Sequence, residues 1–304
     1  MIKPNLFILG APKSGTSSMA HYLSQHPDVI LSTPKEPNFF CSDVTGAFNS
    51  AENLNDYLGN CFPSNFSEYK FVCDASVSSL YSDEAVDKIL KFNPSATFLV
   101  MLRNPTDLVY SFHQQLVNSF QEDEHDFETA WNLQKKRRLD LNIPKSCRMP
   151  KSLQYGKVGL LGGQLKRLYQ KVDESRVKVI FFEDFSKDPL SEFNNVIDFL
   201  KLDYFDAVKL SVVNKSKQTR FKLLRKIVNI IANIKERIGF KGSLGVLTYI
   251  TNKNFKPYER PSLNNSILIE LGDYFESDIN LLQDITGRDL SLWKSKGNNR
   301  KLDW

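Results

Sequence analysis

The segment Asn5–Thr16, NLFILGAPKSGT, decides the fold predicted for this chain. An apolar run from Leu6 to Leu9 leads into a turn of small residues, and a helix-like pattern starts at Ser17. Gly10 and Gly15 allow the backbone to approach a ligand closely. The unpaired N–H groups and partial positive charge of a helix N-terminus bind phosphate or sulfate groups. The sequence therefore predicts a buried strand, an anion-binding turn and a helix.

The turn differs from the common nucleotide-binding loop, G-x-x-x-x-G-K-[ST], in the position of its lysine. Gly10 and Gly15 have the spacing of that motif, but Thr16 follows Gly15 where the motif requires Lys. Lys13 lies inside the turn instead, where it can meet an anionic group from the loop side. This departure argues against an ordinary ATPase. A strand–turn–helix without a ligand is the simpler alternative, but it would give Lys13 little to interact with.

Length and composition indicate a globular protein that handles an anionic ligand. The chain has 304 residues, 41% of them hydrophobic, and a net charge of +5. This mild excess of cations suits an anionic cofactor, and it is too small to indicate nucleic acid by itself. The four cysteines are widely spaced, so we expect neither a metal site nor a disulfide scaffold. With no signal peptide and no apolar run of about 20 residues in the sequence, a cytoplasmic location is expected.

Strand-like and helix-like segments alternate along the chain, which predicts an α/β fold of three layers, α/β/α, around a central parallel sheet. After the first strand, the predicted strands are Val29–Leu31, Phe71–Asp74, Thr97–Leu102 and Val177–Phe182. The predicted helices are Ser17–Gln25, Asp83–Phe92, one starting at Pro105, Phe127–Leu139, Leu160–Lys171, Pro189–Leu200 and Leu263–Thr286. Ligands of such folds bind beyond the carboxyl ends of the strands.

Several charged residues fall at predicted strand ends. Lys35 and Glu36 lie between two prolines that keep the segment extended, although a surface ion pair is the plainer interpretation. Arg103 ends the strand Thr97–Leu102, and Ser111 follows eight residues later on the next helix. The cations of residues 135–138 end another helix, where they are either a solvated face or a docking site for an acidic substrate.

Four motifs in order resemble the sulfotransferases that use 3′-phosphoadenosine 5′-phosphosulfate (PAPS), in particular the bacterial and heparan-sulfate-like branch. They are Lys13-Ser14-Gly15-Thr16, Lys35-Glu36-Pro37, Asp74-Ala75-Ser76 and Leu102–Pro105 running on to Tyr110-Ser111. The C-terminal Leu290-Ser291-Leu292-Trp293 also looks like the end of bacterial members. The resemblance extends from Leu6 to Trp293. It implies the P-loop NTPase-like sulfotransferase fold in a single domain over residues 1–304, with 220–261 as a helical insertion.

The resemblance also implies how the cofactor is held. The 5′-phosphosulfate would lie against Lys13 and the backbone of the turn, at Ser14, Gly15, Thr16 and Ser17. Arg103 and Ser111 would bind the 3′-phosphate, because the planar guanidinium pairs with phosphate through two hydrogen bonds. A second contact to that phosphate would come from Lys217 or Arg220, of which we favour Arg220.

For the chemistry, the resemblance implies Glu36 as the base that takes a proton from the acceptor. Lys13 would stabilise the charge on the departing phosphate oxygen, and Lys35 would assist at the sulfuryl oxygens. Small-molecule sulfotransferases of the cytosol use a histidine base instead. His113 is the minority candidate for that role, and a role in packing is the plainer interpretation of this residue. No metal is implied. The acceptor would be a hydroxyl or amine on a carbohydrate, a glycolipid or a small molecule.

Two other functions remain open from the sequence. A P-loop ATP-dependent kinase would bind ATP at the same turn. The position of Lys13, inside the turn and not after Gly15, argues against this function. A membrane-peripheral binding protein would use the segment 222–238, where one helical face is apolar and the other is rich in Lys and Arg. Packing of that helix on the domain is the plainer interpretation of the same pattern, and membrane contact would be compatible with catalysis.

Overall fold

The computed structural model describes residues 3–46, 51–205, 207–210, 217–219, 255–257 and 261–294. The chain separates into two compact units, residues 1–213 with 263–302, and residues 214–262 with 303–304. Within the smaller unit, β6 (Lys217–Thr219) pairs antiparallel with β7 (Phe255–Pro257). Arg220 and the predicted helix 222–238 lie outside the described residues, so their assigned roles stay predictions, as does the single domain over residues 1–304.

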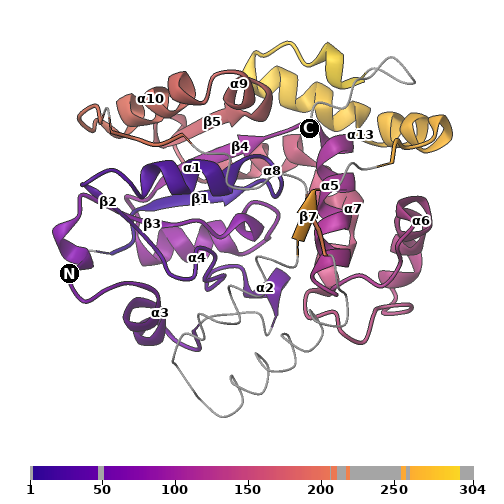
Figure 1. The fold of residues 1–304 in the computed structure, drawn as a ribbon, viewed down its shortest axis with the longest axis horizontal. Helices are drawn as coiled ribbons and strands as arrows, with labels where there is room; N and C mark the ends of the chain where they lie inside the picture. The colour runs from indigo at the N-terminus through magenta and orange to yellow at the C-terminus, as the bar shows by residue number, and fades with distance from the viewer. Residues whose placement is uncertain are drawn as a thin grey trace. The chain divides into compact units, whose positions relative to one another are not determined.

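A five-stranded sheet forms the centre of the larger unit (Figure 1). Its order is β2 (Val29–Leu31), β3 (Phe71–Asp74), β1 (Leu6–Gly10), β4 (Thr97–Leu102) and β5 (Val177–Phe181). All four pairings are parallel, as predicted. The central strands β1 and β4 are continuous apolar runs because both of their faces are covered.

Alternate residues of the strands face opposite layers, which produces the predicted three-layer arrangement. On β4, Leu99 and Met101 join a core cluster with α1 (Thr16–Leu23), α9 (Phe182–Lys187) and α10 (Pro189–Leu200). Phe98, Val100 and Leu102 join the cluster on the other face. That cluster includes residues of α4 (Ala85–Phe92), α5 (Pro105–Asn118), α6 (Phe127–Arg137), α7 (Tyr155–Gly159), α8 (Leu161–Tyr169) and α13 (Asn265–Thr286).

The predicted elements are confirmed to within a few residues, and the differences have local causes. The helix predicted over Leu160–Lys171 is α8, a separate helix from α7, and the side chain of Asp278 accepts hydrogen bonds from the N–H groups of Gly162 and Gly163 at 2.7 and 2.8 Å. The structure also has two short helices between β2 and β3, α2 (Ser42–Thr45) and α3 (Leu54–Cys61). Phe182 begins α9 rather than ending β5.

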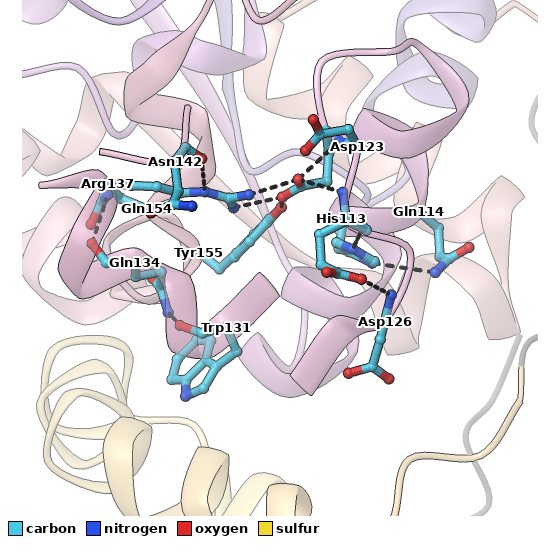
Figure 2. A network of polar contacts seen from close by, with 12 residues as sticks. His113, Gln114, Asp123, Asp126, Trp131, Gln134, Arg137, Asn142, Gln154 and Tyr155 are labelled. Atoms are coloured by element: carbon cyan, nitrogen blue, oxygen red, sulfur yellow. Dashed lines mark hydrogen bonds and ion pairs between the residues drawn. The ribbon is translucent and has the colours of Figure 1, made fainter. Parts of the chain in front are cut away.

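The cation cluster at residues 135–138 is not uniformly solvated, which corrects one expectation. Arg137 is buried and forms two hydrogen bonds, of 2.6 and 2.7 Å, with the buried carboxylate of Glu122. Tyr155 donates its hydroxyl to the same carboxylate at 2.6 Å. Figure 2 shows the guanidinium of Arg137 and the phenol of Tyr155 meeting inside this network. Only the other three cations of the cluster are exposed.

Candidate active site

The turn after β1 has a left-handed backbone at two positions. Lys13 and Gly15 have positive φ angles of 64° and 86°, and Gly15 is the N-cap of α1. A Cβ atom on Gly15 would lie 2.9 Å from the ring of Phe185, so this position requires glycine for space as well as conformation. Ser14 is fully buried within the turn, whereas Lys13 is partly exposed. The helix therefore begins at the turn with its first N–H groups unpaired within the helix.

Arg103 connects the end of β4 to this turn. Its guanidinium donates a hydrogen bond of 3.2 Å to the carbonyl of Lys13 and lies 4.5 Å from the ring centroid of Phe182. Arg103 is nearly buried, so both contacts hold the planar group in a fixed orientation. The structure thus brings together two predicted site residues that are 90 positions apart in the chain.

Glu183 lies beside Arg103, at the start of α9. Its Oε1 accepts a 3.4 Å hydrogen bond from the N–H of Asn104, whose side chain caps α5. Burial raises the pKa of the Glu183 carboxyl, against the lowering effect of that hydrogen bond and of Arg103. Its Oε2 is buried without a hydrogen-bond partner among the described residues. The ends of β4 and β5 therefore converge on one polar region.

Ser111 lies two turns into α5, almost fully buried. Its Oγ makes no hydrogen bond within the described part of the chain. Buried hydroxyl groups are normally paired. An orphaned hydroxyl on the helix that follows Arg103 is therefore suited to an added hydrogen-bonding ligand.

Lys35 and Glu36 follow β2 and contact the end of β3. Lys35 Nζ lies 2.8 Å from Glu36 Oε1, and the side chains are 25% and 36% exposed. The Lys35 carbonyl accepts hydrogen bonds from the N–H of Ala75 at 3.3 Å and from Ser32 Oγ at 3.0 Å. The ion pair of the plainer interpretation is present, on a segment hydrogen-bonded to the end of β3. In the sheet β3 lies between β2 and β1, so the segment containing Glu36 and the turn containing Lys13 follow the two strands that flank β3.

His113 is a packing residue. It is fully buried, its Nε2 lies 2.9 Å from the Glu124 carbonyl, and its ring contacts the rings of Phe127 and Tyr155. Burial lowers its pKa. A base that accepts a proton from a substrate must be accessible to it, so His113 does not fit that role.

The C-terminal segment reaches the same end of the sheet, which the sequence did not predict. Arg288 forms an ion pair with Asp184, and its guanidinium lies 4.3 Å from the ring centroid of Phe181. The carbonyl of Trp293 accepts a 3.5 Å hydrogen bond from Asn104 Nδ2. This segment therefore supports the N-terminus of α5, next to Arg103.

Neither a metal cluster nor a membrane span was found in the described ranges. Those residues include no group of three or more His, Cys, Asp or Glu side chains arranged to hold a metal ion. Likewise, none of the helices described has the length and apolarity needed to cross a bilayer.

Comparisons with known proteins agree on one family. The family model described as "Sulfotransferase domain" matches residues 3–243. A solved sulfotransferase from Alicyclobacillus acidocaldarius is similar over 97% of this chain and 100% of its own, with a TM-score of 0.65 and 25% identity.

Curated relatives include sulfotransferases of carbohydrates. Heparan sulfate glucosamine 3-O-sulfotransferase 5 of Mus musculus is 23% identical over 296 residues, which are 95% of this chain and 73% of that protein. Carbohydrate sulfotransferase 15 of Homo sapiens is 25% identical over 70% of this chain. The match spans only 46% of that relative, and 13% of the bifunctional heparan sulfate N-deacetylase/N-sulfotransferase 1 of Caenorhabditis elegans.

Proposed function

The chain belongs to the sulfotransferase domain family. We propose that it transfers the sulfuryl group of PAPS to a hydroxyl or amine, with a carbohydrate hydroxyl as the favoured acceptor. The observation that carries this proposal is the buried Arg103 bonded to the carbonyl of Lys13. A buried cation held against an anion-binding turn is suited to a ligand with two separate anionic groups, such as PAPS.

The residues fit this cofactor in two places. Lys13 and the backbone from Ser14 to Ser17, at the N-terminus of α1, would hold the 5′-phosphosulfate. Arg103 and the orphaned hydroxyl of Ser111 would bind the 3′-phosphate. When bound, PAPS supplies the electrophilic sulfur and a phosphate leaving group.

Glu36 would be the base that removes the proton of the acceptor. Its carboxylate is about a third exposed, so an acceptor can reach it, and Lys35 Nζ at 2.8 Å restricts its orientation. Proton transfer to a positioned carboxylate contributes roughly 10²–10⁴-fold to such reactions. Lys13 would stabilise the negative charge on the departing phosphate oxygen, and Lys35 would assist at the sulfuryl oxygens.

For the acceptor, a carbohydrate or glycolipid is favoured over a small molecule by the comparisons. The named relatives include a carbohydrate sulfotransferase and two proteins that carry heparan sulfate in their names. Such similarity is a weaker argument for the acceptor than for the reaction, because specificity depends on loops that vary within a fold.

Transfer of radiolabelled sulfate from PAPS tests this proposal, with desulfated heparin, a glycolipid and a phenol as acceptors. Glu36→Gln should keep the affinity for 3′-phosphoadenosine 5′-phosphate and lose roughly 10²-fold or more in turnover. Lys13→Ala should reduce both. Glu84→Gln is the matched control, because Glu84 is also paired with a lysine but lies at the start of α4. Turnover of Glu36→Gln close to that of the wild type would rule out the base assignment.

A further inference from the structure

Beneath the Lys35–Glu36 segment lies a group of buried polar residues that the proposed chemistry does not use. They come from three different parts of the chain, and we refer to them as the β3 clamp: Asn38, Tyr57, Asp74 and Ser76. All four are at most 6% exposed. Burying polar groups is unfavourable unless they are hydrogen-bonded, so the partners of these residues indicate what they do.

Asp74 is the central residue of the clamp, at the end of β3. Its Oδ2 accepts a hydrogen bond from the hydroxyl of Tyr57 at 2.8 Å, and its Oδ1 accepts one from the N–H of Ser76 at 2.9 Å. Both carboxylate oxygens are therefore engaged, and the second bond fixes the backbone of Ser76. The aromatic ring of Tyr57 stacks on that of Phe39, with centroids 4.7 Å apart, so α3 also contacts the segment after Glu36.

Ser76 connects Asp74 to the backbone around Glu36. Its Oγ accepts a hydrogen bond from the N–H of Asn38 at 2.9 Å. Asn38 has a positive φ of 59°, and its side-chain amide donates to the carbonyl of Glu36 at 3.1 Å. On the other side, the N–H of Ala75 donates to the carbonyl of Lys35. The main chain is thus tied to the β3 end both before and after the Glu36 side chain.

We propose that the β3 clamp positions Glu36 for proton transfer, with Ser76 as the positioning residue that acts through Asn38. This inference rests on the proposed role of Glu36 as base. Glu36 is partly exposed and its carboxylate has Lys35 as an ion-pair partner on the same segment, so the backbone determines where the carboxylate lies. A displacement of about 1 Å in such a group costs on the order of 10²-fold in rate.

A purely structural role would not require this arrangement. The end of β3 would be held as well by apolar side chains, without the cost of burying a carboxylate. Ser76 Oγ instead accepts a hydrogen bond from the backbone N–H of Asn38, and the N–H of Ala75 donates to the carbonyl of Lys35, so the two bonds hold the backbone on either side of the proposed base. The clamp therefore differs from the rest of the core, because its hydrogen bonds hold the backbone that carries Glu36.

The test is Ser76→Ala, measured as transfer of radiolabelled sulfate from PAPS to desulfated heparin and to water. We expect turnover to fall about 10- to 100-fold while the affinity for 3′-phosphoadenosine 5′-phosphate stays within about twofold. The amide of Asn38 should exchange with deuterium faster, because it loses its acceptor. Tyr57→Phe, which removes one hydroxyl, should lower turnover in the same direction. Thr45→Val is the control, since that buried hydroxyl donates to the carbonyl of Cys41, the N-cap residue of α2.

A double substitution separates positioning from general damage. In the Glu36→Gln background, Ser76→Ala should cause no further loss of turnover, because the group it positions is already absent. A full additional loss in that background, or an equal loss in Thr45→Val, would overturn the inference. Near-wild-type turnover of Glu36→Gln would refute the base assignment and the inference with it. Absence of any transfer by the wild type, to heparin or water, would instead count against the proposed function itself.

Discussion

Arg137→Met is the substitution whose effect on stability follows most directly from the structure. It removes the cation from a buried pair in which Glu122 Oε1 and Oε2 each accept a hydrogen bond from the guanidinium. The carboxylate would keep the hydroxyl of Tyr155 and the N–H groups of Asp123 and Glu124 as donors. Its charge, however, would be buried without its counter-ion.

Removing one partner of a buried ion pair costs roughly 3–5 kcal/mol. The donors that remain place this case near the lower end of the range. With an unfolding entropy of about 2.1 cal/mol/K per residue over 304 residues, this predicts a melting temperature lower by about 5 °C. Lys136→Met, an exposed neighbour in the same helix turn, should change stability by less than about 0.5 kcal/mol.

The pH dependence of the difference in melting temperature between the wild type and Arg137→Met gives a second readout. Burial raises the pKa of the Glu122 carboxyl, but Arg137, Tyr155 and the N–H of Glu124 outweigh that effect and leave the pKa below its usual value of 4.5. The stabilisation is therefore complete above pH 4.5 and is lost as the pH falls through the lower, folded-state value. Without Arg137, burial favours the protonated carboxyl, so the two melting temperatures should converge as the pH falls from 7 to 4.

Differential scanning calorimetry at several pH values measures both quantities. The double substitution Glu122→Gln with Arg137→Met should be more stable than Arg137→Met alone, because no unpaired charge remains buried. A melting temperature of Arg137→Met within about 1 °C of the wild type at pH 7, where about 5 °C is expected, would refute the reasoning.

Two further predictions concern other parts of the larger unit. Gly162→Ala should cost about 1–3 kcal/mol in urea denaturation, because its Cβ would lie 2.3 Å from the carbonyl oxygen of Asp278, whereas Gly59→Ala, with no atom within 4 Å, should not destabilise. An unchanged midpoint for Gly162→Ala would contradict the packing of α8 on α13. Burial lowers the pKa of His113, so the stability of the wild type should fall as the pH drops below 6.5, the usual value. His113→Gln should weaken this dependence, as thermal melts at pH 7 and 5 would show, and an equal slope in both proteins would refute it.

The fold was largely predictable because apolar runs and strand–helix alternation dominate this sequence. Thr97–Leu102 is identified as a central strand by composition alone, since parallel strands are covered on both faces. The ends of these strands then indicate where charged residues gather. On that basis Lys13 and Arg103 were both expected at the carboxyl ends of strands, and the hydrogen bond from the guanidinium to the Lys13 carbonyl shows that these two ends meet.

The burial of Arg137 could have been predicted from the helical spacing of the sequence. The buried side of α6 runs through Phe127, Ala130, Trp131 and Gln134, and Arg137 continues this helical spacing. Its three exposed neighbours gave the appearance of a solvated cluster. Its partner could not be inferred, because Glu122 is 15 residues away in a segment with no regular pattern.

The β3 clamp and the C-terminal segment were beyond sequence reasoning for a different reason. The bond from Asn38 to Ser76 joins residues 38 positions apart, and the one from Asn104 to Trp293 spans 189 positions. Neither residue type signals such a contact, since Asn and Ser are ordinary in turns. These bonds depend on how whole strands and helices are placed, which local patterns do not specify.

Calorimetric titration with 3′-phosphoadenosine 5′-phosphate, adenosine 5′-phosphate and ATP tests the central claim most directly. If Arg103 and Ser111 hold a 3′-phosphate, the first ligand should bind at least about 10-fold more tightly than the other two, since hydrogen bonds to charged groups contribute roughly 1.5–3 kcal/mol. Arg103→Met should remove that preference while the wild type keeps it. Equal affinity for all three ligands, or tighter binding of ATP, would contradict the account.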